Sequence, residues 1–455
     1  MQRERLGSRL GFILLSAGSA IGIGNVWKFP YMVGSNGGAL FVLLYLFFLG
    51  VIGIPVMTME FSLGRASQKS PAKIYNELEP KGTKWHIHSP FMVIGNYILM
   101  MFYTVVSGWM IKYFVDTARG VFSDFDTSAI DDFYENMKTE SPIIILYTFI
   151  VIIGCFAVCS FGLQKGLERV TKYMMLILLG LMVVLAINSI FLDGGSEGLK
   201  FYLVPNFKSM REIGVINVVV SAMNQAFFTL SLGMGAMAIF GSYIDKKRAL
   251  LGESLNVALL DTFVALCSGF IIFPACSAYG VEVDNGPSLI FKTLPNIFNN
   301  IPFGRFWGSI FFVFMSFAAL STVLTTFENI ISCTMDIFSI KRRKAAIINC
   351  GLMLILSLPC ILGFSVFSGF TPFGGNSTIM DLEDFAVTNI ILPLGSLIFV
   401  LFCTSKFGWG WKNFTDEANN GKGLKIKNGM RFYISYILPI IIFGLFVLGL
   451  YNFFK

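Results

Sequence analysis

Apolar segments of about 20 residues recur along almost the whole chain, from residue 10 to residue 454. A helix needs about 20 residues to cross the hydrocarbon core of a bilayer, which is about 30 Å thick. Only 13% of the 455 residues are charged, whereas soluble domains carry about 25%. We therefore expect an all-α membrane protein that forms a single domain over residues 1–455, because no stretch between the apolar segments is long enough for a soluble domain.

Eleven segments are long and apolar enough to be transmembrane helices. They cover residues 10–34, 39–64, 90–118, 141–161, 170–192, 214–242, 249–281, 303–338, 345–367, 385–405 and 431–454. Residues 287–300 contain two prolines and are too short to span. They are expected to form a re-entrant or surface helical loop.

The Lys and Arg residues orient these spans, because cytoplasmic loops accumulate them. Of the 34, 24 fall at the N-terminus or in the loops after the even-numbered spans, and 8 fall on the opposite side. The N-terminus is therefore predicted to lie inside and the C-terminus outside. Since the net charge of +7 is spread over short loops, the expected surroundings are a lipid bilayer and not nucleic acid.

Two spans are interrupted by glycines and polar residues at mid-membrane depth, at 18–25 in the first span and at 224–235 in the sixth. Small residues can simply allow helices to pack closely. Breaks that lie five spans apart are, however, typical of two inverted five-helix repeats with a binding site between them. Repeat one would cover about 10–192 and repeat two about 214–405, with an additional helix at about 431–454.

A broken helix offers chemistry to a ligand. Its free N–H groups suit a carboxylate, and its free carbonyls suit a small cation or an ammonium group, so an amino acid fits both. Oxygen ligands without thiols or imidazoles favour a hard cation such as sodium. The eight cysteines all lie in apolar segments without a CxxC pair, so neither disulfides nor a soft-metal site is expected. His86 and His88 lie in a predicted cytoplasmic loop and are expected to be solvated, not catalytic.

These features resemble the neurotransmitter:sodium symporters, and in particular their bacterial amino-acid:sodium members with eleven transmembrane helices. The similar motifs are residues 9–11, 22–31, 36–38, 55–60, 228–233 and 318–322. The resemblance implies sodium-coupled uptake of an amino acid by alternating access, in a bacterial inner membrane. It implies no enzymatic activity.

The resemblance also implies two sodium ions. The ligands of the first would be the bound substrate's carboxylate and Ala20, Asn25, Thr229 and Asp261. The ligands of the second would be Gly18, Ile21, Ala318, Ser321 and Thr322. Asp261 stands where many relatives carry Asn, and its fixed negative charge predicts that chloride is not required.

The implied substrate contacts come from the same segments and from the third span. They are Ala20, Ile23, Gly24, Leu99, Tyr103, Phe228, Ser231, Met234, Thr322 and Thr326. The apolar members of this set predict a hydrophobic substrate, either an aromatic or a bulky aliphatic L-amino acid.

The resemblance implies a charged gate on each side of the site. The outer gate would be Lys28 with Asp384, where Lys replaces the usual Arg. The inner gate would be Arg3 with Asp336, supported by Ser242 and Tyr243.

Two features depart from the family pattern on the inner side. Leu6 replaces a tryptophan, and residues 172–188 of the fifth span lack a proline found in some relatives.

Other functions remain open from the sequence. A sodium-independent amino-acid or amine carrier of the same fold is the main alternative, and a channel or a substrate sensor is a second. The hydroxyls of Ser321 and Thr322 favour sodium coupling, and the apolar faces of the spans disfavour a channel. The preferred amino acid, the sodium stoichiometry, proton antiport and the oligomeric state are not determined by the sequence.

Overall fold

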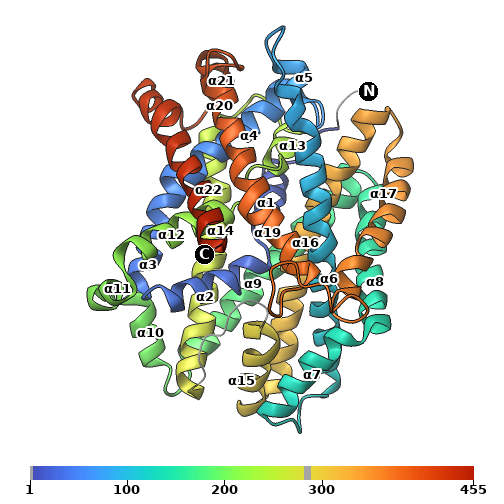
Figure 1. Cartoon of the computed structure of the whole chain (residues 1–455), viewed down its shortest axis with the longest axis vertical. Helices are drawn as coiled ribbons and strands as arrows, with labels where there is room; N and C mark the ends of the chain where they lie inside the picture. The colour runs from blue at the N-terminus through green and yellow to red at the C-terminus, as the bar shows by residue number, and fades with distance from the viewer. Residues whose placement is uncertain (1–3, 281–287, 455) are drawn as a thin grey trace.

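The structure, a computed structural model, describes residues 4–280 and 288–454. Within these residues the regular structure is helical, apart from an isolated bridge between Arg248 and Lys422. Most of the long helices run along the long axis of the molecule (Figure 1). The all-α prediction is therefore confirmed.

The described residues contain nine continuous helical segments that are long and apolar enough to cross a membrane. Their α-helices are α3 (Ala39–Phe48), α4 (Ile54–Ser67), α6 (His88–Arg119), α8 (Ser141–Ser160), α9 (Arg169–Ile190), α14 (Leu250–Tyr279), α16 (Gly304–Phe338), α17 (Arg342–Leu356), α18 (Leu358–Leu362), α19 (Ile379–Phe385), α20 (Leu392–Thr404) and α22 (Leu438–Phe454). Short π-helical segments continue some of them, namely η2 (Leu49–Gly53), η4 (Leu163–Glu168), η6 (Ala386–Ile391) and η8 (Tyr433–Ile437).

The first predicted span is broken. It consists of α1 (Arg9–Ala20), a single 3-10 turn and α2 (Lys28–Ser35), and the chain bends by 68° at the break. The sixth predicted span is divided in the same way into α12 (Val215–Phe228) and α13 (Ala236–Gly241). Neither α12 nor α13 alone is long enough to span. Both breaks lie where the glycines predicted them.

Glycine permits the conformation of the second break, residues 229–235, which we call the unwound segment. Gly233 and Gly235 have φ values of 108° and 75°, in a region that residues with a Cβ adopt only at a cost. At Gly233 a Cβ would also lie 2.3 Å from the carbonyl oxygen of Leu392. The unwound segment therefore needs glycine both for its backbone angles and for its close contact with α20.

The central helix of the bundle is α16, which packs against α1, α6, α8 and α9. Small residues bring other helices into backbone contact. A Cβ at Gly64 of α4 would lie 1.8 Å from the carbonyl oxygen of Ala238, and one at Gly241 of α13 would lie 2.3 Å from that of Phe61. Because glycines occupy these positions, α13 lies directly against α4.

Several predicted boundaries were wrong. The tenth span begins at Ile379 and not at 385, because Thr378 caps it: its backbone N–H and its hydroxyl both donate to Asp381 Oδ2, at 2.7 and 2.8 Å. The ninth ends at Leu362 and not at 367, where Gly363 begins a run of turns.

The loops between the spans also contain helices. They are α5 (Ile74–Leu78), α7 (Thr127–Thr139), α10 (Ser196–Leu203), α11 (Phe207–Ile213), α15 (Leu294–Asn300) and α21 (Trp411–Ala418). Helix α15 confirms that the described part of 287–300 is a helical loop; Pro287 lies outside the described residues.

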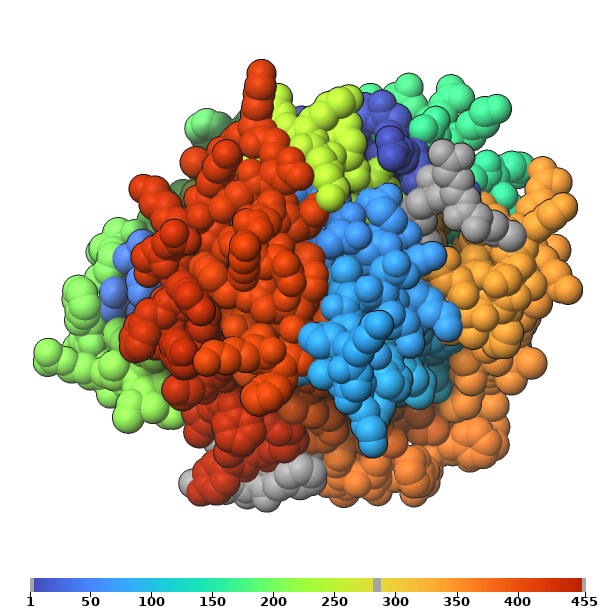
Figure 2. All heavy atoms as spheres, turned by 90° about the horizontal axis from the view of Figure 1, so that it is seen from above, coloured from blue at the N-terminus to red at the C-terminus, as the bar shows by residue number. Residues whose placement is uncertain are grey.

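Two side chains assigned to solvated loops are in fact buried. His88 is 8% exposed, and the Tyr75 hydroxyl lies 2.9 Å from its Nδ1, so the expectation of a solvated His88 was wrong. Arg65 is fully buried, because α21 folds back over the end of α4. Figure 2 shows this end of the molecule, where the orange-red segment around α21 lies against yellow-green residues that follow α13.

Arg65 holds α21 through a buried ion pair. Its Nε lies 2.7 Å from Glu417 Oε1, and its Nη1 donates to the carbonyl of Arg248 at 2.7 Å. Lys246 pairs with the other oxygen of Glu417 at 2.9 Å, but its side chain is 55% exposed. The same carboxylate thus makes one buried and one solvated ion pair.

We predict that Arg65→Ala lowers the free energy of unfolding by about 3–5 kcal/mol, because Glu417 then loses its buried partner and keeps only the solvated Lys246. Lys246→Ala, the matched control, is expected to cost less than about 1 kcal/mol, since its pair is solvated. Unfolding of the detergent-purified variants would measure both. Equal losses would contradict this assignment of α21.

Candidate functional site

The two helix breaks meet in the middle of the bundle at Asp261 of α14. Asn25, in the first break, donates from Nδ2 to Asp261 Oδ1 at 2.8 Å, and the Thr229 hydroxyl, in the second break, donates to Oδ2 at 2.9 Å. All three side chains are buried. One carboxylate therefore connects both breaks.

This cluster contains the side chains predicted to bind the first sodium. Asn25 and Thr229 also lie close to each other, with 3.4 Å between Nδ2 and the hydroxyl. Ala20, the last residue of α1, lines the adjoining cavity. A carboxylate, a hydroxyl and a backbone carbonyl are hard oxygen ligands, so this donor set fits sodium. The Asn25 amide faces Asp261 through its Nδ2, while its Oδ1 accepts from the backbone N–H of Gly22 at 3.3 Å.

The five residues predicted to bind the second sodium also lie together. The Thr322 hydroxyl lies 3.3 Å from the carbonyl oxygen of Gly18, 3.2 Å from that of Ile21 and 3.4 Å from that of Ala318. The Ser321 hydroxyl donates to the Ala318 carbonyl at 2.9 Å. Since α1 ends at Ala20, the Gly18 carbonyl lacks a partner in its own helix. Three carbonyls and two hydroxyls therefore converge on one buried position.

A cavity of about 470 Å³ adjoins both clusters. Nine of the ten predicted substrate residues line it: Ala20, Ile23, Gly24, Leu99, Tyr103, Phe228, Ser231, Met234 and Thr322. Thr326 does not line it; it lies buried one helical turn further along α16. The sequence-based set of substrate contacts is thus brought together except at that position.

The first break leaves room for the aromatic walls of the cavity. The Tyr103 hydroxyl accepts a hydrogen bond from the backbone N–H of Ile23 at 3.0 Å. A Cβ at Gly22 would lie 2.6 Å from that hydroxyl, and a Cβ at Gly24 would lie 3.0 Å from the Phe228 ring. Glycine at both positions lets backbone amides face the cavity beside Tyr103, as a carboxylate site requires.

The predicted outer gate residues lie at one end of the cavity, and they are apart. Lys28 places its Nζ 3.5 Å from the centre of the Phe228 ring. Asp384 accepts a hydrogen bond from Thr388 at 3.1 Å, and within the described residues no ion pair joins it to Lys28. The cavity extends past both side chains, so it is open toward the side predicted to be external.

The opposite side contains the predicted inner gate residues. Asp336 accepts a hydrogen bond from the backbone N–H of Ser70 at 2.7 Å. The Ser242 hydroxyl donates to the Ile239 carbonyl at 2.6 Å, and Tyr243 donates to Glu328 at 2.5 Å. Arg3 lies outside the described residues. Asp336, Ser242 and Tyr243 do not line the cavity.

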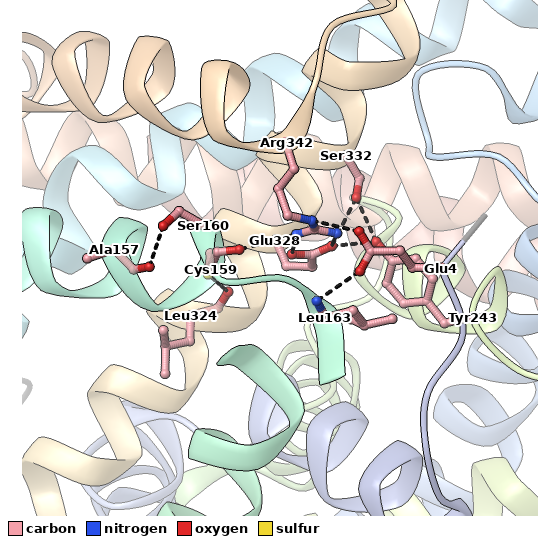
Figure 3. Close-up of polar contacts among 10 residues, drawn as sticks. All are labelled: Glu4, Ala157, Cys159, Ser160, Leu163, Tyr243, Leu324, Glu328, Ser332 and Arg342. Carbon is pink, nitrogen blue, oxygen red and sulfur yellow. Dashed lines mark hydrogen bonds and ion pairs between the residues drawn. The ribbon is translucent and has the colours of Figure 1, made fainter. Parts of the chain in front are cut away.

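Sequence analysis missed a buried polar cluster on this side, which Figure 3 shows. Glu328 of α16 is fully buried, and Arg342 of α17 binds it from Nη1 at 2.6 Å and from Nη2 at 3.0 Å. Arg342 also pairs with Glu4 at 2.9 Å, and Glu4 accepts the backbone N–H of Leu163 at 2.8 Å. We call these residues the inner clasp, because they join the N-terminal segment to α16, α17 and η4.

A second acid was missed in the second span. Glu60 of α4 is fully buried and accepts the backbone N–H groups of Gly233 at 2.6 Å and of Met237 at 3.2 Å. It satisfies backbone groups that the unwound segment exposes. Glu60 and Glu328 both carried a signal in the sequence, because an acid inside an apolar span is costly and usually functional.

Comparison with known proteins identifies the family. The sequence pattern of the sodium:neurotransmitter symporter family matches residues 3–124 and 132–455. The chain belongs to this family. Because members of this family carry solutes across membranes, the protein is a sodium-dependent membrane transporter and not an enzyme.

Relatives of this symporter occur in several bacteria. It is 33% identical to an uncharacterized sodium-dependent transporter of Bacillus subtilis over 98% of both chains. It is 32% identical to another of Haemophilus influenzae over 99% of both chains. The comparison with solved structures matches the crystal structure of MhsT in complex with L-phenylalanine, whose sequence is 35% identical to this chain. The two structures superpose with a TM-score of 0.87 over 98% of this chain and 100% of MhsT. The symporter therefore shares the fold of MhsT.

We predict that Arg342→Ala opens the inner clasp of the symporter, because Glu328 then lacks the cation that compensates its burial. The Cys159 side chain is buried, and its carbonyl accepts from Arg342 Nη1 at 3.4 Å. Alkylation of the Cys159 thiol by a small maleimide should therefore become roughly tenfold faster or more in this variant. Mass spectrometry of the labelled protein would measure this rate.

Cys403 of α20, also buried, is the thiol control and should not change. Glu4→Gln retains the pair between Arg342 and Glu328, so it should have a smaller effect. An unchanged Cys159 rate in Arg342→Ala would show that the inner clasp does not keep this side closed.

Proposed function

We propose that this protein uses a sodium gradient to take up hydrophobic L-amino acids, aromatic or bulky aliphatic, by alternating access. Its location would be a bacterial inner membrane, with the N-terminus inside and the C-terminus outside. The observation that carries the proposal is the convergence of two oxygen-rich clusters on one cavity at the two helix breaks. Binding of two sodium ions and of substrate would then be coupled, because all three share residues of these breaks.

The lining of the cavity supports the class of substrate. Leu99, Phe228 and Met234 supply apolar surface, while backbone amides beside Tyr103 suit the substrate's carboxylate. The charged groups Lys28 and Asp384 lie at the cavity end assigned to the outer gate. MhsT, of the same fold, has been crystallised with L-phenylalanine. A charged substrate side chain that faces Leu99 and Met234 would find no charged partner there, and its burial would cost several kcal/mol.

The closed inner side and the open cavity support the transport direction. In this conformation the cavity extends past Lys28 and Asp384, while the inner clasp closes the other side. Substrate and sodium would enter from outside and draw the two breaks together. Lys28 and Asp384 would then pair above the substrate, and opening of the inner clasp would release it inside.

Two inverted repeats would supply the two broken helices that move during transport. Repeat one would comprise about 10–192 and repeat two about 214–405, with the broken helices α1 and α12–α13 at their starts. Residues 431–454 would form an additional helix outside the repeats. Because an odd number of spans separates the two starts, the second repeat would be inverted in the membrane.

Uptake into proteoliposomes tests the proposed function. Labelled phenylalanine, tryptophan, leucine, glutamate and lysine would be offered with and without an inward sodium gradient. We expect uptake of the first three only, and only with sodium. Uptake that is independent of sodium would favour the alternative, a sodium-independent carrier of the same fold.

We predict that transport requires sodium but not chloride, because Asp261 supplies a fixed negative charge beside the first sodium. Asp261→Asn should still fold, because its amide oxygen can accept from Asn25 and its amide nitrogen can donate to the Thr229 hydroxyl. It should weaken sodium activation by about ten- to hundredfold, as the loss of a charged partner does. Addition of chloride should restore part of the activity. Uptake would be titrated with sodium in chloride and in gluconate.

Asp116→Asn is the control for this variant, because it also neutralises an acid. Asp116 pairs with Lys112 and lies outside the cluster proposed to bind the first sodium. It should leave sodium activation unchanged. A strong chloride requirement in the unmodified protein would refute the role of Asp261.

We predict that Ser321→Ala combined with Thr322→Val abolishes the contribution of the second sodium ion to uptake. As helix-packing hydroxyls alone they would contribute less than about 1 kcal/mol of stability. The control is Ser316→Ala with Thr325→Val on the same helix, whose hydroxyls bond to α16 carbonyls at 2.7 and 2.9 Å. Uptake against sodium concentration would be compared. Unchanged sodium dependence in the first variant would place the second ion elsewhere.

A further inference from the structure

Two buried asparagines hold one carbonyl of the unwound segment. Asn96 of α6 donates from Nδ2 to the carbonyl oxygen of Met234 at 3.0 Å, and Asn329 of α16 donates to the same oxygen at 3.5 Å. Asn96 is 2% exposed and Asn329 is fully buried. Neither residue lines the substrate cavity.

The two amides form a closed network. Asn329 also donates to Asn96 Oδ1 at 3.2 Å, and Asn96 also donates to the Met92 carbonyl at 2.7 Å. Each Nδ2 thus uses both of its hydrogens. Because a buried network whose donors are all used is rigid, the Met234 carbonyl is held in place relative to both α6 and α16.

Met234 is held from the other side as well. Glu60 of α4 accepts the N–H of the preceding residue, Gly233, at 2.6 Å. The segment around Met234 is therefore clamped between a carboxylate and two amides. Without such a clamp, the glycines on both sides of Met234 would let its backbone move freely.

The side chain of Met234 occupies the space between α6 and the cavity. It lines the cavity, yet it is only 2% exposed. A Cβ at Gly95 of α6 would lie 3.3 Å from the Met234 sulfur and 2.8 Å from Ile391 Cγ2. A side chain at residue 95 would therefore crowd both Ile391 and the Met234 sulfur, so its absence leaves room for Met234 to withdraw from the cavity.

We propose that Asn96 and Asn329 are positioning residues for substrate size, which act by fixing the Met234 carbonyl and so the depth of the cavity at Met234. The inference rests on the proposed function, since it concerns the amino-acid site of that function. Gly95 acts on the same side chain in the opposite direction. Asn96, Asn329 and Gly95 thus act on the depth of the cavity at Met234, although none of them lines the cavity.

The test compares competition by tryptophan and by leucine against labelled phenylalanine in wild type and variants. Asn96→Ala and Asn329→Ala each leave space behind Met234 and remove one of the two hydrogen bonds to its carbonyl, so the side chain can withdraw. The ratio of half-inhibitory concentrations should shift in favour of tryptophan by about five- to tenfold, the factor for one buried hydrogen bond. Gly95→Ala pushes the sulfur toward the cavity and should shift the ratio toward leucine.

Asn349→Ala is the matched control. Asn349 is also a buried asparagine in a network, which it forms with Tyr97 and Thr334, but it lies on α17 and does not contact the unwound segment. It should lower thermal stability as much as Asn96→Ala without changing the tryptophan-to-leucine ratio. If Asn96→Ala does not fold, the Asn329→Ala and Gly95→Ala ratios decide the test.

A ratio that stays at the wild-type value in the folded variants, or that moves as far in Asn349→Ala, would overturn the proposal. Such a result would leave the proposed function intact, because wild type would still transport phenylalanine with sodium. Absence of uptake by wild type would instead contradict the proposed function.

Discussion

The structure depends on one constraint: two helices lose their internal hydrogen bonds in the middle of a bundle that spans the membrane. Every backbone group released there needs a partner. Side chains from four other helices supply them. Glu60 accepts from the unwound segment, Tyr103 accepts from Ile23, Ser268 donates to the Asn25 carbonyl at 2.7 Å, and Thr322 faces the carbonyls at the end of α1. The same unsatisfied groups that would destabilise a membrane helix form the site that we propose for sodium and an amino acid.

Buried charged side chains also need partners, and their pairing differs between the two sides of the molecule. On the side predicted to face the cytoplasm, Glu328 and Arg342, like Arg65 and Glu417, are paired at short distance. At the opposite end of the cavity, Lys28 lies over an aromatic ring and Asp384 is not paired with it. A buried ion pair that loses one partner is costly, so the inner side resists opening until other interactions compensate. The energetic asymmetry between the two ends therefore agrees with the alternating access that we propose.

The success of sequence analysis differed with the kind of interaction. The spans and both breaks follow from hydropathy and glycine, which act locally, and the residues of the two oxygen-rich clusters follow from motifs that resemble a known family. The start of the tenth span at Ile379 was missed, because charged residues make its first turns polar. The hydrogen bonds between Thr378 and Asp381 cap the helix there all the same. The inner clasp was missed, because Glu4 and Arg342 are 338 positions apart and meet only in the folded chain. Burial of His88 and of Arg65 was missed for the same reason: helices distant in the sequence cover them.

The sequence by itself determined that this chain lies in a membrane, where its helices break, and which oxygen-bearing residues are available at the breaks. These properties depend on the chemistry of neighbouring residues, since a 20-residue apolar run or a cluster of glycines has the same consequence in any fold. Only the tertiary structure decided that Thr326 does not line the cavity, that Lys28 lies over Phe228, and that Asn96 and Asn329 meet at the Met234 carbonyl. Such contacts depend on the rotation and depth of each helix, and these are determined by packing against helices that lie far away in the sequence.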